Sequence, residues 1–213
     1  YSEDDMQYIN KLASTVVFNS IAQLTTYKKT LNSNIRVGLR LNPEHIEVTN
    51  PLYSPCVPGS RFGVLSKELT ADVVKTINGF HIHALCQNDG ESLVRLMDAT
   101  AEKFHSFLLQ DSIKWVNFGG GHMIPTPTYN HHHVCEAINQ FQDNYNVQVV
   151  LEPGEAVVYK VGQLVASVLD VVHNTMDIAI LDTSATAHMP DVIEMPYRPA
   201  VIDAGASGEK AFT

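Results

Sequence analysis

The stretch that decides the fold is Ile-Lys-Trp-Val-Asn-Phe-Gly-Gly-Gly at residues 113–121, an apolar strand that runs directly into three glycines. Because glycine has no Cβ, the turn at Gly119, Gly120 and Gly121 allows backbone N–H groups to converge on an anion such as a phosphate. A plain strand-to-loop turn has the same pattern, so the motif alone leaves both interpretations open. Amphipathic segments precede and follow it, which indicates one unit of an α/β fold.

The same strand and helix pattern repeats along the chain. Strands are predicted to begin near residues 15, 35, 79, 113 and 146, and helices are predicted over 2–13, 19–30 and 66–77, after Asp89-Gly90 and around 134–141. The helix after Gly90 is the clearest, since its apolar residues recur at three- and four-residue spacings: Leu93, Leu96, Met97, Phe104, Phe107 and Leu108. This order favours a parallel α/β sheet or barrel.

Two segments depart from this pattern. Residues 42–63 contain four of the ten prolines and form a loop of uncommon length, as functional loops often do. After Pro153, residues 156–172, 178–182 and 200–203 are predicted to be extended with little helix between them, which indicates a second, β-rich domain from about residue 160. Five strand units are too few for a complete eight-unit barrel, which takes about 250 residues. We therefore expect either an open sheet or an internal piece of a longer enzyme.

Composition excludes several classes of protein. The 213 residues carry 14 Lys and Arg against 23 Asp and Glu, a net charge of −9, which argues against sequence-independent binding to nucleic acid or anionic lipid. No apolar run approaches the roughly 20 residues of a membrane span, and the first residues do not resemble a secretion signal. Three cysteines without CxxC spacing fit reduced thiols, so we expect a cytoplasmic protein. The chain begins with Tyr1 rather than Met, which suggests a start inside a longer polypeptide.

A second motif is Phe-His-Ile-His-Ala-Leu-Cys at residues 80–86. Side chains alternate along a strand, so His81 and His83 are expected on one face and Ile82 on the other. Two histidines at this spacing, with Cys86, suit a metal site, whereas an imidazole at a strand end also suits stacking on a flat aromatic cofactor. A buried histidine that bonds a backbone carbonyl is the third interpretation. The residues alone leave all three open.

Carboxylates supply the remaining motifs. Glu152 follows the strand that ends at Leu151, which places it at the rim where α/β folds have their active sites, and Glu155 follows after a Pro-Gly turn. Residues 181–191 contain Asp182, His188 and Asp191 among small polar residues, a set suited to a cationic or zwitterionic ligand. Three histidines at 131–133 are interpreted as a solvated helix start.

Four of these motifs in order resemble those of the fold-type III pyridoxal phosphate decarboxylases, especially the branch that acts on carboxylated triamines. They are HIHALC at 81–86, NFGGGH at 117–122, LEPGE at 151–155 and LDTSATAHMPD at 181–191, and the resemblance extends to RVGLRLNP at 36–43, SRFGV at 60–64 and EMPYRP at 194–199. It implies decarboxylation of carboxynorspermidine or carboxyspermidine in polyamine biosynthesis, by a homodimer. The implied fold is a partial alanine-racemase-like β/α barrel over 1–160, lacking its first strands, followed by the start of a β-domain over 161–213.

The resemblance also assigns roles. The phosphate of pyridoxal phosphate is expected at Gly119, Gly120 and Gly121, His83 is expected to stack on the cofactor ring beside Cys86, and Glu152 is expected to bond the ring nitrogen. Substrate contacts are implied for Glu155, His188 and Asp191. Glu155 stands where ornithine and diaminopimelate relatives carry Arg, which leaves the phosphate more dependent on backbone donors.

The family forms its imine with a lysine after the first barrel strand, and none of the nine lysines here has that context. The family's C-terminal cysteine–aspartate segment is not found before Thr213 either. We therefore interpret the chain as a central fragment that does not decarboxylate on its own. Two alternatives stay open: a non-catalytic barrel that binds pyridoxal phosphate, and a metal-dependent hydrolase that uses His81, His83 and Glu152.

Overall fold

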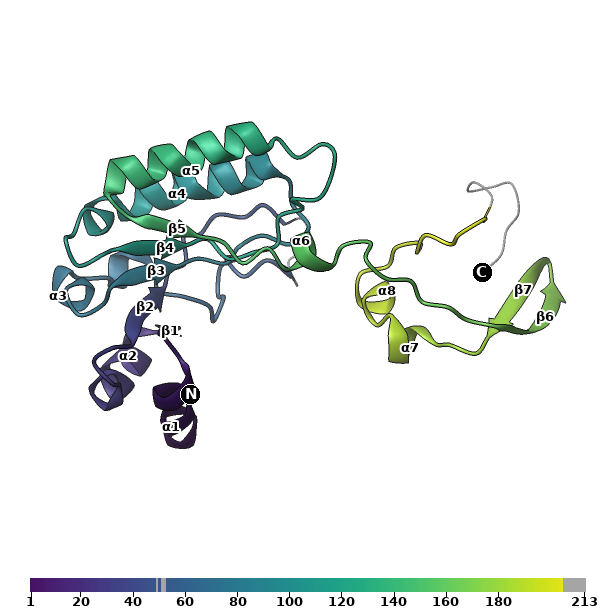
Figure 1. The fold of residues 1–213 in the computed structure, drawn as a ribbon, viewed down its shortest axis with the longest axis horizontal. Helices are drawn as coiled ribbons and strands as arrows, with labels where there is room; N and C mark the ends of the chain where they lie inside the picture. Colours follow the sequence, from purple (N-terminus) through teal and green to yellow (C-terminus); the bar gives the residue numbers. More distant parts are fainter. Residues whose placement is uncertain (49, 51–52, 205–213) are drawn as a thin grey trace. The chain divides into compact units, whose positions relative to one another are not determined.

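The structure is a computed structural model that describes residues 1–48, 50 and 53–204. The chain divides into two compact units, Tyr1–Tyr159 and Lys160–Thr213, which we call the first and the second unit. Figure 1 shows the elements of each unit along the sequence.

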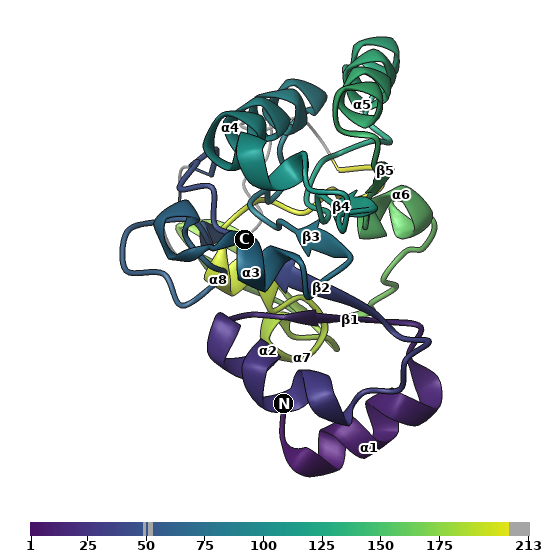
Figure 2. The ribbon, with the colours of Figure 1, turned by 90° about the vertical axis from the view of Figure 1, so that its left-hand side faces the viewer.

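The first unit is built on a five-stranded parallel sheet whose spatial order equals the chain order, with β1 and β5 at its two edges. In-register partners run across it from Leu39 to Phe80, then to Val116 and Val149. Every strand begins within two residues of its predicted start, so the parallel α/β arrangement is confirmed (Figure 2). The strands are β1 (Thr15–Phe18), β2 (Arg36–Arg40), β3 (Gly79–His81), β4 (Trp115–Asn117) and β5 (Gln148–Val150).

Helices connect successive strands. Figure 1 shows the two longest, α4 (Gly90–Leu108) and α5 (His131–Tyr145), side by side over one face of the sheet. Asp89 caps α4, because its carboxylate accepts a hydrogen bond from the N–H of Ser92 at 2.8 Å. The shorter helices of this unit are α1 (Glu3–Leu12), α2 (Ile21–Tyr27), α3 (Ala71–Val74) and α6 (Gly154–Val158).

The core lies between the sheet and these helices. Phe18, Leu39 and Phe80 of three neighbouring strands are fully buried. The predicted apolar face of α4 is confirmed, since five of its six residues are buried and Phe107 packs against the core while partly exposed. Burial of one such side chain contributes roughly 1.5–3 kcal/mol, so the core fixes the strands that carry the candidate site.

The continuous helix predicted over residues 66–77 is wrong. The chain forms a 3₁₀ turn at Ser66–Glu68, an extended residue at Leu69, and then the single-turn α3. The Thr70 side chain accepts a hydrogen bond from Val73 N–H and so starts a new helix, while Leu69 is buried against the core. Tertiary burial and a cap residue thus outweigh the apparent helical period.

The second unit contains an antiparallel hairpin and two single-turn helices: β6 (Val168–Asn174), β7 (Met176–Leu181), α7 (Ala185–His188) and α8 (Asp191–Glu194). The extended conformation predicted from residue 156 is wrong at its start, because Pro153 occupies the N-cap position of α6 and the chain turns helical there. Residues 200–203 form no strand, and α7 and α8 lie where little helix was expected. Among the described residues, none of the helices has the length and apolar character of a membrane span.

Candidate active site

Polar side chains lie at the carboxyl ends of four parallel strands. Because the strands are parallel, these ends meet along the same side of the sheet, which we call its carboxyl edge. Arg40 ends β2, His81 ends β3 with His83 two residues further, and Asn117 ends β4 two residues before the glycine turn. Glu152 follows β5 by two residues. The structure therefore gathers motifs that lie up to 112 residues apart in the sequence, from Arg40 to Glu152.

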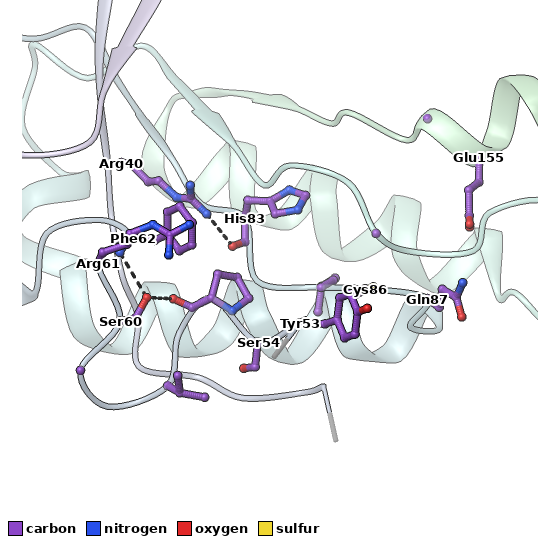
Figure 3. A pocket seen from close by; sticks show the side chains of 16 residues that line it. Arg40, Tyr53, Ser54, Ser60, Arg61, Phe62, His83, Cys86, Gln87 and Glu155 are labelled. Atoms are coloured by element: carbon purple, nitrogen blue, oxygen red, sulfur yellow. Dashed lines mark hydrogen bonds between the residues drawn. The ribbon is translucent and has the colours of Figure 1, made fainter. Parts of the chain in front are cut away.

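A cavity of about 790 Å³ opens at this edge (Figure 3). One wall is formed by residues 53–62 of the long proline-rich loop, and Arg40 contributes from β2. Four of the predicted site residues line the cavity: His83, Cys86, Gly121 and Glu155. Gly119, Gly120 and Glu152 are adjacent to these residues but do not line the cavity.

The glycine turn packs between the His83 segment and Glu152. Gly119 and Gly121 have φ of +67° and +84°, a left-handed backbone that favours glycine. A Cβ on Gly120 would collide with the backbone carbonyl of Glu152, so only glycine permits this approach. The Gly120 N–H points at Nδ1 of His83, 3.3 Å away. The turn, the histidine and the glutamate therefore form one contiguous cluster.

The two histidines lie on one side of their strand, as predicted. Their rings are parallel, with centroids 6.5 Å apart, while Ile82 points into the core and is fully buried. Strand β3 ends at His81, but the alternation of side chains continues beyond it to His83. Burial is the main cause that lowers the pKa of both His81 and His83; Glu152 acts in the opposite direction on each, and nearby Arg40 lowers each further. Both rings are therefore neutral at pH 7.

Glu152 is held by a residue that the sequence motifs did not single out. The Asn117 side-chain amide donates a hydrogen bond to Oε1 of Glu152 at 2.7 Å, and its oxygen accepts from the Gly119 N–H at 2.8 Å. His81 Nε2 lies 3.7 Å from the same Oε1. The Glu152 side chain stays 52% exposed, so its carboxylate is oriented without being enclosed. The sequence feature that could have revealed Asn117 is its position two residues before the first glycine of the turn.

Arg40 is a second site residue that was missed, although it stands in the quoted RVGLRLNP segment. Its guanidinium donates to the His83 carbonyl oxygen at 3.2 Å and stacks on the Phe62 ring, with its central carbon 4.5 Å from the ring centroid. Burial lowers the pKa of Arg40, but Cys56 and Glu152 act in the opposite direction. Arg40 therefore brings positive charge to the cavity beside His83.

Asn88 joins three segments around the cavity. Its side-chain oxygen accepts from the Cys86 N–H at 2.8 Å, and its side-chain amide donates to the Glu47 carbonyl oxygen at 3.2 Å. Its backbone N–H donates to the Gly121 carbonyl oxygen at 2.9 Å, and its backbone oxygen accepts from Met123 N–H at 2.8 Å. One residue thus links the long loop, the His83–Cys86 segment and the glycine turn.

The long loop is also attached to α4 by charge. The carboxylate of Glu47 accepts two hydrogen bonds of 2.8 Å from the guanidinium of Arg95, and His45 Nε2 lies 2.7 Å from it. Hydrogen bonding to Arg95 is the main cause that lowers the pKa of Glu47 to about 2. This bidentate geometry is among the stronger ion-pair arrangements in proteins, so it fixes the start of the loop that walls the cavity.

The three predicted substrate contacts fall in different units. Glu155 lines the cavity, and its buried Oε2 has no hydrogen-bond partner among the described residues. Burial, and next the charge of Glu155, raise the pKa of the Cys86 thiol. His188 and Asp191 belong to the second unit, where His188 Nδ1 lies 2.9 Å from Thr183 Oγ1 and Asp191 accepts a hydrogen bond of 2.8 Å from Tyr197.

The geometry does not provide the metal centre of the hydrolase alternative. Over residues 1–48, 50 and 53–204, no three His, Cys, Asp or Glu side chains are grouped so that they could hold a metal ion. His81 and Glu152 are neighbours, but the parallel ring of His83 bonds the glycine turn instead. No lysine is found among the described residues that line the cavity.

The parallel α/β unit of this chain is similar in fold to solved structures of one class of protein, the amino-acid and polyamine decarboxylases. Within that class, a crystal structure of carboxynorspermidine decarboxylase from Campylobacter jejuni, complexed with norspermidine, matches with a TM-score of 0.81 and 41% identity. The match covers 92% of this chain and 50% of that one.

Comparison of the sequence with curated relatives also finds decarboxylases of carboxylated polyamines. The chain is 42% identical to a carboxynorspermidine/carboxyspermidine decarboxylase of Campylobacter jejuni, over 96% of this chain and 53% of the relative. It is 38% identical to a carboxyaminopropylagmatine decarboxylase of a Synechocystis strain, over 94% of this chain and 52% of the relative. No protein-family model matches. The resemblance to these decarboxylases is thus confirmed, and the chain spans about half the length of the curated relatives it matches.

Proposed function

We propose that the whole protein decarboxylates carboxynorspermidine, carboxyspermidine or both, with pyridoxal phosphate as its cofactor. The observation that carries the proposal is the cluster of Gly120, His83 and Glu152 at the carboxyl edge of the sheet, next to a cavity. The similarity to decarboxylases of carboxylated polyamines over nearly the whole chain supports the choice of substrate.

The residues present fit this cofactor. A Cβ would overlap His83 at Gly119, the Glu152 carbonyl at Gly120 and the Leu85 carbonyl at Gly121. Of the three, Gly121 lines the cavity, where backbone without a side chain suits a phosphate. The parallel histidine rings offer a flat surface, and the oriented carboxylate of Glu152 lies on the same cluster. Pyridoxal phosphate, when bound, supplies the electron sink for the carbanion left by loss of CO₂.

Each residue then has a distinct task. Glu152 would keep a proton on the cofactor's ring nitrogen, because a close negative charge favours the protonated form. Asn117 positions Glu152 and leaves its carboxylate open to a ligand. His83 is neutral, and its Nδ1 faces the Gly120 N–H, so the imidazole is held in a fixed plane. Cys86 lines the cavity beside it as a thiol, because its pKa is raised.

The acidic residues suit a substrate that carries several ammonium groups. Glu155 presents a buried oxygen without a hydrogen-bond partner in the described part of the chain, which an ammonium group would satisfy. His188 and Asp191 are assigned to the same substrate on the family resemblance. We further propose a homodimer, with residues 1–160 as part of a β/α barrel and 161–213 as the start of a β-domain.

The Synechocystis relative supports a second candidate substrate, carboxyaminopropylagmatine, because its identity to this chain is close to that of the first relative. All three candidates are carboxylated polyamines. CO₂ release from each, measured side by side with the whole protein, ranks them.

The test of the function is Glu152→Gln in the whole protein loaded with pyridoxal phosphate. Losing an electrostatic group at a reacting centre costs about 10²–10³ in kcat, and we expect a loss of this size with cofactor affinity changed far less. Glu102→Gln, on the exposed side of α4, is the matched control. Full turnover by Glu152→Gln would refute the role of Glu152. Cofactor binding without CO₂ release from any candidate would favour the non-catalytic alternative.

A further inference from the structure

In one part of the cavity, two positively charged guanidinium groups lie against a single aromatic ring. The central guanidinium carbons of Arg40 and Arg61 lie 4.5 Å and 4.4 Å from the centroid of the Phe62 ring. All three residues line the cavity, and Figure 3 shows them grouped together. Arg40 comes from strand β2 and Arg61 from the long loop, so the tertiary structure creates this pair.

Neither arginine is neutralised within the described residues. No carboxylate forms an ion pair with Arg40 or Arg61 there, and Arg40 donates instead to the neutral carbonyl of His83. Glu152 acts on Arg40 only at longer range, since its carboxylate is bonded to Asn117. Two like charges on one ring repel each other, and a half-buried cation without an anion is costly. An anionic ligand would relieve both effects.

Another part of the same cavity carries a negatively charged side chain. Glu155 contributes a carboxylate whose buried Oε2 has no hydrogen-bond partner among the described residues. A ligand that carries both a carboxylate and ammonium groups would match both parts of this lining. The substrates proposed above have this chemistry, whereas the decarboxylated amine lacks the anionic group.

The loop holds Arg61 in place before any ligand arrives. The Asn19 side-chain amide donates to the Arg61 carbonyl oxygen at 2.9 Å, and its oxygen accepts from the Gly63 N–H at 3.0 Å. The Phe62 N–H donates to Ser60 Oγ at 3.1 Å. The backbone on both sides of the guanidinium is therefore fixed, which lowers the entropy lost on binding. The Arg61 side chain itself is exposed, so its donors are accessible to a ligand.

We propose that Arg61, stacked on Phe62, binds the carboxylate of the substrate and makes the cavity prefer the carboxylated amine over its decarboxylated product. This inference rests on the proposed function and adds a specificity-determining residue to it. Arg40 supports the site as the second positive charge, while one of its donors is engaged by the His83 carbonyl oxygen.

The experiment compares Arg61→Gln, Arg61→Lys and the control Arg36→Gln in the whole protein with pyridoxal phosphate bound. Arg36 lies at the start of β2, the opposite end of that strand from Arg40 and the cavity. A charge-assisted hydrogen bond is worth enough that its loss should raise the KM for carboxynorspermidine about ten- to hundredfold. The inhibition constant of norspermidine should change by less than about threefold, because this product has no carboxylate to lose. Arg61→Lys should recover part of the affinity.

The other outcomes decide against the proposal. If KM and the inhibition constant rise together, Arg61 shapes the cavity without choosing the anion. If cofactor affinity, measured by absorbance titration, falls while KM stays, Arg61 serves the cofactor phosphate. If the unaltered protein releases no CO₂, the proposed function fails, but the subsite is still tested by calorimetry. Preferential binding of carboxynorspermidine over norspermidine that disappears in Arg61→Gln would support it, and equal binding of both would refute it.

Discussion

The two units differ in what holds their residues in place. In the first unit, strands and helices bury an apolar core in which Phe80 and Leu96 are inaccessible to solvent. In the second unit no described residue between 160 and 204 is buried, and the hairpin β6–β7 exposes Leu169 by 67% and Val171 by 56%. The backbone pairing of the hairpin is nevertheless regular over most of its length.

Packing in the first unit can preorganise a site, and the second unit lacks such packing among its described residues. His83, Gly120 and Glu152 stand on segments that packing holds together, so their mutual geometry is set by the core. His188 and Asp191 are oriented by partners within six residues in the sequence. We therefore expect substitutions in the first unit to change stability and cofactor binding together, and those in the second unit to leave the fold of the first unchanged.

The largest effect should come from Leu96→Ala in the core, with Leu169→Ala on the hairpin as its counterpart. Deleting a buried Leu side chain costs about 2–5 kcal/mol of unfolding free energy, whereas an exposed substitution changes it by less than about 0.5 kcal/mol. Urea unfolding followed by the fluorescence of buried Trp115 measures both. A large loss in Leu169→Ala would show that another part of the protein covers the hairpin.

Gly120→Ala should have the next largest effect. Its Cβ would overlap the Glu152 carbonyl, and such overpacking costs typically about 1–3 kcal/mol. Cofactor affinity should fall as well, because the turn must move away from Glu152. Gly162→Ala, where a Cβ would contact nothing within 4 Å, is the control in the second unit. Unchanged unfolding and unchanged cofactor titration in Gly120→Ala would contradict the tight packing of the turn.

Asn88→Ala should destabilise the first unit by about 1–2 kcal/mol, since it leaves the Cys86 N–H without its side-chain acceptor. Asn88→Asp keeps that acceptor but places a second acceptor oxygen against the Glu47 carbonyl, so a loss in this variant reports the link to the long loop. Thermal unfolding and cofactor titration measure both variants. Equal losses in the two variants would mean that the bond to Cys86 is not the one that matters.

Glu47→Gln should have the smallest effect, about 1 kcal/mol or less for one partly exposed pair, and it should depend on pH. The pKa of Glu47 is about 2 when folded and near 4.5 otherwise, so its ion pair stabilises the fold above about pH 4.5. That stabilisation is lost as the pH falls toward 2. Unfolding of wild type and variant at pH 3 to 7 should therefore converge at the acidic end. Asp72→Asn, which breaks an exposed pair with Lys75, should show almost no difference.

Much of the fold could be predicted because local patterns agreed with it. The helix α4 followed from apolar spacing and its Asp89 cap, and each strand of the sheet followed from a short apolar run. The prediction over residues 66–77 failed where burial of Leu69 broke a weak helical pattern. At the end of the first unit, Val157 and Val158 suggested a strand, but Pro153 started a helix.

Local motifs were enough to predict the residue types of the candidate site and their order: the glycine turn, the histidine pair and the strand-end glutamate. The tertiary structure alone decided which other residues join them. Asn117 bonds Glu152 across 35 positions of sequence, and Arg61 meets Arg40 on one ring only because a long loop folds over the strand end. The physical reason is that motifs arise from local backbone requirements, whereas a binding site arises from contacts between segments that only the packed core brings together.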